Sequence, residues 1–179
     1  MREFERHDPL FSLCGLNCGL CSMKLGGHCP GCGMGNRSCK LARCSLSHGE
    51  VEYCFQCGDY LCEEYEQIDD YDSFISHRNQ KADLEKAKRI GMEAYNREQE
   101  EKGKILHMLL ENYNDGRRKT FYCIAVNLLE LDDIYGILEQ IRKSTALNTM
   151  EMKEKCAYAV KLFQSVAEQR NISLKLRKK

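Results

Sequence analysis

The chain has 179 residues, and its 27 basic and 27 acidic side chains cancel to a formal charge of zero. Hydrophobic residues make up 42% of it, which excludes a disordered chain and fits one domain, or a small module joined to a larger one. A dedicated nucleic-acid binder usually carries a basic excess, because it must displace counterions from phosphates. The balanced charge therefore argues against a nucleic-acid partner. We interpret the basic spots at 117–119 and 175–179 as a loop and a frayed tail.

The first nine residues are too charged to contain the apolar stretch of a signal peptide. No run approaches the roughly 18 apolar residues that a transmembrane helix needs. We therefore expect a cytoplasmic protein without a membrane segment. In that reducing compartment, closely spaced cysteines coordinate metal more often than they form disulfides.

Cysteines dominate the N-terminal third of the chain. Three C-x2-C pairs, at 18–21, 29–32 and 54–57, each allow one tight turn to aim two sulfurs at the same ion. Two further cysteines, Cys123 and Cys156, lie in apolar patterns and are interpreted as core residues. The expected metal ligands are the other ten: Cys14, Cys18, Cys21, Cys29, Cys32, Cys39, Cys44, Cys54, Cys57 and Cys62.

Four thiolates complete a tetrahedral zinc site, so ten cysteines predict about two zinc ions. In the simplest, sequential partition, the first site consists of Cys18, Cys21, Cys29 and Cys32, and the second of Cys39, Cys44, Cys54 and Cys57. Cys14 and Cys62 would then substitute into either site or bind a third ion with His28 or His48, although surface positions are favoured for both histidines. An interleaved arrangement fits the spacing equally well.

A structural role for the metal follows from the poor hydrophobic pattern of this segment. Between Leu10 and Leu61 the apolar residues other than cysteine are scattered singly, without the period of a strand or a helix. A segment of about 50 residues with so little core normally needs a covalent or metal staple. Structural zinc contributes on the order of 10 kcal/mol per ion to folding.

The favoured function is therefore a protein-interaction or regulatory module without catalytic residues. Cysteine ligands suit iron–sulfur clusters as well as zinc, so an iron–sulfur redox protein is one alternative. A metalloenzyme would need an open zinc beside a carboxylate such as Glu63 or Glu64. A nucleic-acid-binding zinc module would need exposed aromatic residues such as Tyr53 and Phe55. The spacing of the cysteines that hold the cluster of radical-SAM enzymes also occurs here, at Cys14, Cys18 and Cys21. The strand–helix alternation that would form the barrel of those enzymes is missing from this sequence.

The expected fold is a small, irregular, metal-stabilised domain over 10–66, an acidic connector over 67–80 and a mainly α-helical bundle of about four helices over 81–179. Apolar residues at three-four spacing predict helices from Lys81 to a turn at 114–116, and over 134–141.

The remaining elements of the helical part are less regular. The run 121–129 allows either a buried helix or a strand, and we favour the helix because no partner strand lies nearby. Asn148, three residues before Glu151, predicts the capped start of the last long helix. The alternation over 172–176 suggests a short strand.

The order of the cysteine motifs resembles a family of uncharacterised prokaryotic proteins known as domain of unknown function 3795 (DUF3795). The matching features are Cys14-Gly-Leu-x-Cys18-x2-Cys21, Cys29-x-Gly-Cys32, Cys39, Cys44 and Cys54-x2-Cys57-Gly-Asp-Tyr-Leu-Cys62. Members often have proline before the last cysteine, where this chain has Leu61. The resemblance spans residues 12–66 and implies metal ligands but no reaction. It does not reach the helical part.

Overall fold

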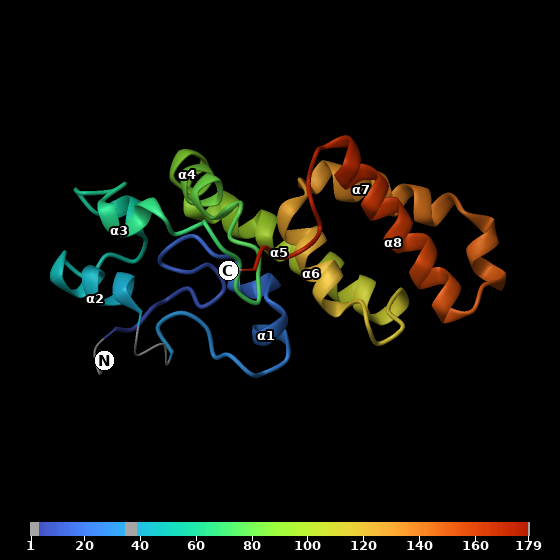
Figure 1. Cartoon of the computed structure of the whole chain (residues 1–179), viewed down its shortest axis with the longest axis horizontal. Helices are drawn as coiled ribbons and strands as arrows, with labels where there is room; N and C mark the ends of the chain where they lie inside the picture. The colour runs from blue at the N-terminus through green and yellow to red at the C-terminus, as the bar shows by residue number, and fades with distance from the viewer. Residues whose placement is uncertain (1–3, 35–38, 179) are drawn as a thin grey trace. The chain divides into compact units, whose positions relative to one another are not determined.

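The computed structural model describes residues 4–34 and 39–178 (Figure 1). These described residues form eight α-helices and three 3-10 turns, and they contain no strand. None of the helices is long and apolar enough to cross a membrane. The helices are α1 (Ser22–Leu25), α2 (Lys40–Ser47), α3 (Glu63–Glu66), α4 (Gln80–Ile90), α5 (Met92–Asn112), α6 (Lys119–Leu128), α7 (Leu131–Lys143) and α8 (Met152–Gln169). The 3-10 turns are η1 (Cys18–Leu20), η2 (Cys54–Gln56) and η3 (Thr145–Thr149).

The chain packs into two compact units. The first consists of Met1–Gln99 with Leu176–Lys179, and the second of Glu100–Lys175. The boundary lies within α5, so that α4 and the first turns of α5 pack with the cysteine-rich segment. All ten expected ligands therefore belong to the first unit.

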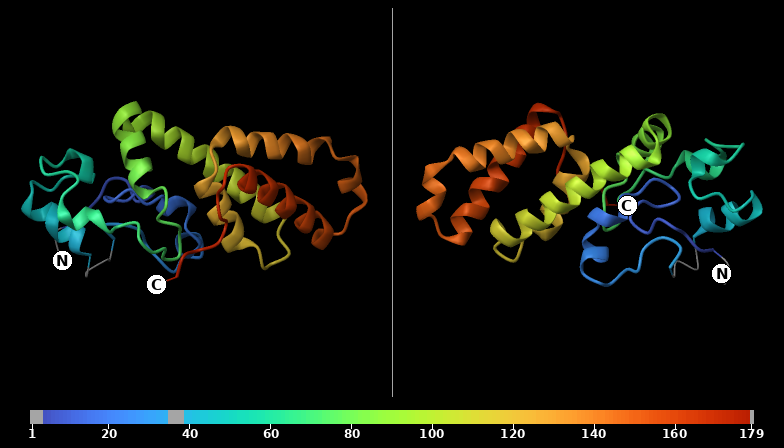
Figure 2. Two further views of the ribbon diagram at one scale, coloured as in Figure 1. Left: turned by 45° about the horizontal axis from the view of Figure 1, so that its top comes forward. Right: turned by 180° about the vertical axis from the view of Figure 1, so that it is seen from behind.

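The second unit confirms the predicted helical character of this part of the chain. The run 121–129 is helical through Leu128, in α6, and its side chains from Tyr122 to Leu129 are all buried. The helices α7 and α8 lie side by side in both views of Figure 2. Cys123 and Cys156 are each 1% exposed, which confirms that they are core residues.

Three local predictions for the helical part are wrong. The long predicted helix is interrupted at Gly91, whose φ of 85° ends α4 before α5 begins. Asn148 lies in η3, and the N-cap of α8 is Glu151, in a capping box with Glu154. The strand over 172–176 does not form, because no described strand exists to pair with it.

The C-terminal tail is held in place within the first unit, so it is not frayed at Arg177. The backbone N–H of Arg177 donates to the Asp72 carboxylate at 2.7 Å, and its guanidinium pairs with the same carboxylate at 3.3 Å. His77 and Arg78 also contact Asp72, whose side chain is fully buried. Lys179, the last residue of the basic tail, lies outside the described part of the chain.

The first unit has a hydrophobic core that the scattered pattern of its first 60 residues does not predict. The cysteine-rich segment and α3 contribute Phe11, Tyr53 and Tyr65, and the following helices α4 and α5 complete it. Three thiol-bearing residues, Cys14, Cys54 and Cys62, pack directly against this core. The complete buried cluster is Phe11, Tyr53, Tyr65, Leu84, Ala87 and Tyr95.

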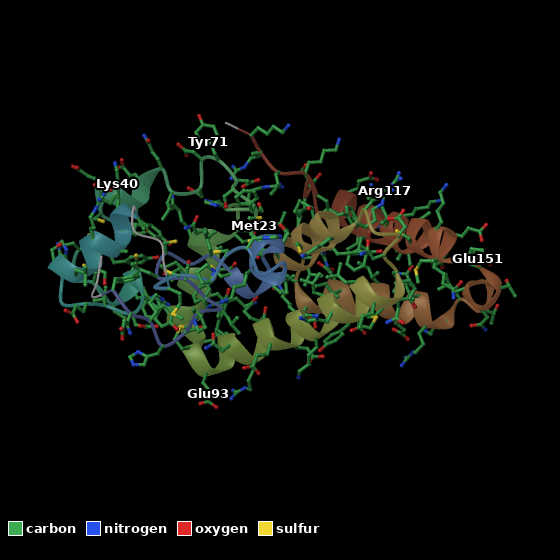
Figure 3. All side chains as sticks on the ribbon, turned by 90° about the horizontal axis from the view of Figure 1, so that it is seen from below. Met23, Lys40, Tyr71, Glu93, Arg117 and Glu151 are labelled. Carbon is green, nitrogen blue, oxygen red and sulfur yellow. The ribbon has the colours of Figure 1, made fainter. Side chains whose placement is uncertain are left out.

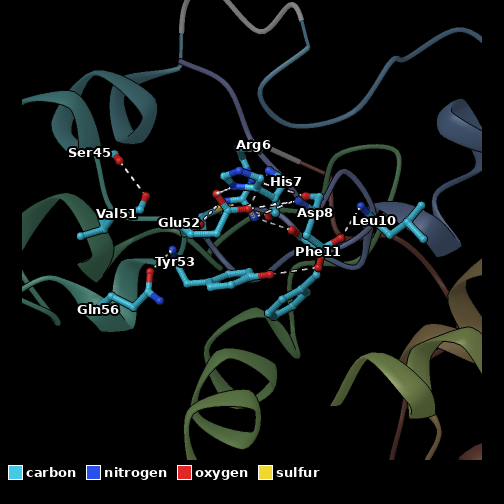
Figure 4. Close-up of polar contacts among 12 residues, drawn as sticks. Arg6, His7, Asp8, Leu10, Phe11, Ser45, Val51, Glu52, Tyr53 and Gln56 are labelled. Carbon is cyan, nitrogen blue, oxygen red and sulfur yellow. Dashed lines mark hydrogen bonds and ion pairs between the residues drawn. The ribbon is translucent and has the colours of Figure 1, made fainter. Parts of the chain in front are cut away.

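The segment before the first cysteine is fixed by polar contacts, shown in Figure 4. The guanidinium of Arg6, 1% exposed, pairs with Glu52 at 3.4 Å and lies 4.9 Å from the centre of the Tyr53 ring. It also donates to the backbone oxygen of Phe11 at 2.8 Å. The Tyr53 hydroxyl donates to the Asp8 carboxylate at 3.0 Å. These contacts hold residues 6–11 against the stretch 51–53, and so fix where the first cysteine lies.

Candidate metal centre

Two of the three C-x2-C pairs adopt the same backbone conformation. In η1 the N–H of Cys21 donates to the oxygen of Cys18 at 3.1 Å, and in η2 the N–H of Cys57 donates to that of Cys54 at 3.0 Å. The residue that closes each turn is extended, with φ and ψ of −81° and 132° in η1 and −73° and 140° in η2. A tight turn of this kind brings the two cysteines of a pair to one side of the chain, as a shared ion requires.

The third pair lies on a loop that is anchored to other parts of the first unit. The Lys24 ammonium of α1 donates to the backbone oxygen of Pro30 at 2.5 Å. Gly31 and Gly33 have φ values of 105° and 85°. A Cβ on Gly33 would lie 2.9 Å from the Arg6 side chain, so only glycine allows this approach. Cys29 and Cys32 are thereby held next to α1 and the N-terminal segment.

Each of the three short helices of the cysteine-rich segment begins directly after a cysteine. The N-cap residues of α1, α2 and α3 are Cys21, Cys39 and Cys62. The eight-residue α2 places the positive end of its dipole beside Cys39, which favours an anionic sulfur there. Helix starts therefore position three of the ten candidate ligands.

Six of the thiols are close enough for their charges to affect the ionisation of their neighbours. Burial raises the pKa of the Cys18 thiol to about 12, and the charges of neighbouring thiolates add to that effect. Burial likewise raises the pKa of Cys14 to about 11, with Cys32 and Cys39 as the neighbouring thiolates. Such electrostatic influence requires short separations. We call the set of six the six-thiol group: Cys14, Cys18, Cys21, Cys29, Cys32 and Cys39.

The other four thiols line one apolar pocket, between α2, η2 and α3. Burial raises the pKa of Cys54, and the nearby thiolates of Cys14 and of the other members raise it further. Leu13, Val51 and Tyr65 contribute apolar wall to the same pocket. Sulfur atoms (yellow) lie among the blue and teal ribbons of this segment in Figure 3. We call this set the four-thiol group: Cys44, Cys54, Cys57 and Cys62.

This grouping differs from the sequential partition. The Cys39 thiolate acts on Cys14 and Cys32, whereas Cys44, further along α2, lines the pocket of the four-thiol group. Cys62, a leftover in the sequential scheme, takes its place beside Cys44.

The candidate histidines occupy exposed positions, as favoured for them. His28 is exposed in the loop after α1. His48 also borders the four-thiol pocket, where its Nδ1 lies 2.8 Å from the backbone oxygen of Cys44 and 3.5 Å from the Cys44 sulfur. Its Nε2 lies 3.5 Å from the Asp59 carboxylate.

In the positions that they occupy, no three His, Cys, Asp or Glu side chains of the described residues converge closely enough to hold one ion. The donor set nevertheless fits a sulfur-preferring metal, because each group offers at least four thiols and few competing oxygen donors.

Supporting residues that the sequence pattern does not reveal connect the ligands to the core. The Tyr65 hydroxyl donates to the backbone oxygen of Cys14 at 2.8 Å. The Asn17 side chain accepts from the Tyr95 hydroxyl at 2.9 Å and donates to the Asp83 carboxylate at 2.8 Å. The only sequence signal for Asn17 is its place directly before Cys18, because a single polar residue has no period.

The features required by the alternative functions are placed as follows. Tyr53 is 6% exposed and stacks on Phe55 at 5.5 Å, so its ring lies in the core and is not free to stack on a base. Glu63 and Glu64 are exposed at the start of α3. The pKa of the Cys44 thiol is raised mainly by burial, then by the Cys62 and Cys57 thiolates, and to a smaller extent by the Glu64 carboxylate.

No protein-family model matches this chain, and no curated protein or solved structure is significantly similar to it.

Proposed function

We propose that this protein binds metal through its ten clustered cysteines, and that the metal stabilises the first unit as a cytoplasmic protein-interaction or regulatory module. The observation that carries the proposal is the four-thiol pocket. Its members come from α2, η2 and the start of α3, up to 18 positions apart in the sequence, and yet they line one cavity. Cysteines recruited only for packing have no reason to share a cavity in this way.

Zinc suits the site best. It accepts four thiolates in a tetrahedral arrangement and requires no redox partner. The four-thiol group supplies one complete ligand set and the six-thiol group at least one more, so the chain would hold at least two ions. An iron–sulfur cluster is the second candidate, because an all-sulfur donor set accepts iron equally well. DUF3795, which the motifs resemble, implies the same ligands without deciding between the metals.

A structural rather than catalytic role fits the number of ligands. Four protein sulfurs saturate a zinc ion and leave no position for substrate or water. A protein partner fits the surface of the first unit, where five large apolar side chains are 48–63% exposed. These are Leu10, Met34, Leu61, Tyr71 and Phe74.

The test is elemental analysis and an absorbance spectrum of anaerobically purified protein. Two or more zinc per chain without visible colour would support the proposal. Iron with sulfide, and a brown absorbance that bleaches on reduction, would replace it with the redox alternative. Cys44→Ser is expected to lose one ion. Cys123→Ala, which removes a buried thiol of the second unit, is the matched control and should lose none. Metal-free wild-type protein with a folded first unit would refute metal binding.

A further inference from the structure

The segment 69–72 of the first unit contacts Arg177 of the C-terminal tail through both backbone and side chain. The backbone N–H of Asp72 donates to the carbonyl oxygen of Arg177 at 3.1 Å, and the N–H of Arg177 donates to the Asp72 carboxylate at 2.7 Å. The Arg177 guanidinium donates to the backbone oxygen of Asp69 and, at 3.3 Å, to the Asp72 carboxylate. The segment therefore recognises an arginine residue as a whole, not only its charge.

The acceptor of this site is held in place by residues outside the tail. The side chain of Asp72 is fully buried. Its carboxylate accepts from the backbone N–H of His77 at 2.8 Å and from the hydroxyl of Ser76 at 3.3 Å, and the Arg78 guanidinium lies 3.6 Å away. These contacts orient the carboxylate whether or not Arg177 is bound, so the site does not depend on the tail for its shape.

The tail, in contrast, lacks the apolar anchors of a permanently packed segment. None of the described residues 170–178 is buried, and its two leucines, Leu174 and Leu176, are only half-buried. The side chain of Arg177 is 41% exposed. A chain end held mainly by exposed polar contacts is held weakly, because water or another ligand can replace each contact. A preformed acceptor with a weakly held occupant is the arrangement of a binding site.

The charges around the site are complementary to those of the tail. Residues 59–77 include seven acidic side chains and no lysine or arginine, whereas residues 170–179 include five basic side chains and no acidic one. Such an acidic surface attracts a basic segment and speeds its association. The acidic side chains that are exposed around the site are Asp59, Glu63, Glu64, Glu66 and Asp70.

The site also lies within the surface that is open to a protein partner. Tyr71 and Phe74 are 49% and 60% exposed and lie within two positions of Asp72 in the sequence. Figure 3 shows Tyr71 at the surface next to the end of the tail. A segment that binds at Asp72 therefore has exposed aromatic surface beside it.

We propose that the segment 69–72 is a binding site for an arginine in a basic segment of a partner protein, and that Arg177 occupies this site until the partner displaces it. The inference names the partner class of the protein-interaction module proposed above and rests on that role, not on the metal. Because Arg177 belongs to the same chain, its effective concentration at the site is on the order of millimolar. The tail therefore excludes weak basic ligands and admits only a partner that binds more tightly.

The test removes the chain's own arginine and supplies another in solution. Arg177→Ala in the full chain should bind a fluorescently labelled peptide with the sequence of residues 173–178 roughly tenfold more tightly than the wild type does, as measured by fluorescence anisotropy. Lys178→Ala removes the neighbouring charge but keeps Arg177, and should bind the peptide as weakly as the wild type. Peptides with alanine or lysine at the arginine position should lose binding to Arg177→Ala.

A second substitution locates the peptide on the chain. Asp72→Asn, added to Arg177→Ala, should abolish the binding, and if this double variant does not fold, the peptides with alanine and lysine decide. Equal affinity of the wild type and Arg177→Ala, or equal binding of the alanine peptide, would overturn the site. A wild-type dimer that Arg177→Ala converts to a monomer would overturn the proposal of a separate partner in favour of a second copy.

Elemental analysis of the same samples separates this inference from metal binding. A metal-loaded chain whose Arg177→Ala variant binds no peptide would overturn the arginine site and leave the metal in place. A metal-free, folded chain whose variant binds the peptide would overturn metal binding and support the arginine site.

Discussion

The hydrogen bond from Tyr65 to Cys14 offers a direct test of how the aromatic core supports the ligands. Tyr65→Phe keeps the ring and removes only the hydroxyl, which donates to the backbone oxygen of Cys14 at 2.8 Å. The side chain is 2% exposed, so water cannot easily replace the lost donor. A buried carbonyl left without its donor costs about 1–3 kcal/mol, and we expect about 1–2 kcal/mol because the geometry of the ring is kept.

Tyr122 provides the matched control in the second unit. Its hydroxyl donates to the backbone oxygen of Tyr113 at the same 2.8 Å, and the residue is fully buried. Tyr122→Phe should therefore cost a similar free energy, without any effect on the cysteine-rich segment.

Hydrogen exchange measured by mass spectrometry can separate the two effects. Tyr65→Phe should speed amide exchange over residues 11–20 and 60–68 by about tenfold, which corresponds to roughly 1.4 kcal/mol. It should also weaken zinc retention in a competition with a chelator. Tyr122→Phe should speed exchange over 113–129 only and leave zinc retention unchanged. Equal zinc retention and unchanged exchange at 11–20 in Tyr65→Phe would refute the idea that the core supports the metal centre.

Three further predictions concern backbone and charge. Gly15→Ala should destabilise the first unit clearly more than Gly27→Ala, as measured by urea unfolding. Both glycines have φ > 0, which costs another residue about 1–2 kcal/mol, but of the two only Gly15 would bring its Cβ against a backbone oxygen, at 2.4 Å. Equal losses of stability in the two variants would contradict the close approach. Asp72→Asn should lower the melting temperature near pH 7. Burial opposes ionisation of Asp72, but hydrogen bonds from Arg177 and His77 lower the pKa of its carboxyl overall. The stability contributed by the Asp72 carboxylate is therefore present above the ordinary carboxyl pKa of about 4 and is lost as pH falls through the lowered pKa. A difference in melting temperature between variant and wild type that persists well below that pKa would contradict this role of the carboxylate. Leu61 is 63% exposed and has a φ of 70°, so Leu61→Gly should raise the free energy of unfolding by about 1 kcal/mol. Leu61→Pro, with φ fixed near −65°, should distort the backbone at the adjacent Cys62 and release zinc. A stable proline variant with its full zinc content would show that this backbone conformation is not required.

The helical part could be predicted from the sequence because its signals are local. The spacing of Ile134, Ile137 and Ile141 places one face of α7 in the core, and all three are buried. The errors there concern ends and interruptions. Gly91 fits the apolar stripe by position, yet its freedom to adopt φ > 0 ends the helix. Asn148 is a residue type favoured as N-cap, yet it lies in η3 and α8 begins after Glu151, so the cap preference of the sequence does not decide where this helix starts.

The cysteine-rich segment could be predicted in composition but not in arrangement. The spacing of the cysteines does not show that Cys39 and Cys44 point to different groups, because that depends on the path of α2. It also does not show that Leu84 and Tyr95 complete the core beneath the thiols. Such contacts join residues far apart in the chain, and a period within either segment contains no information about them.

The contacts of Asn17 connect the proposed metal centre to the helices that follow it. Asn17 directly precedes Cys18, a member of the six-thiol group, and its side chain bonds both to Asp83 in α4 and to Tyr95 in α5. An ion bound at Cys18 would therefore also fix the hydrogen-bond partner of two helices. Because Tyr95 is fully buried, its hydroxyl cannot turn to solvent when that partner moves. Loss of metal at Cys18 should accordingly loosen α4 and the first turns of α5, which gives a regulatory module a way to convert metal occupancy into a change of helix stability.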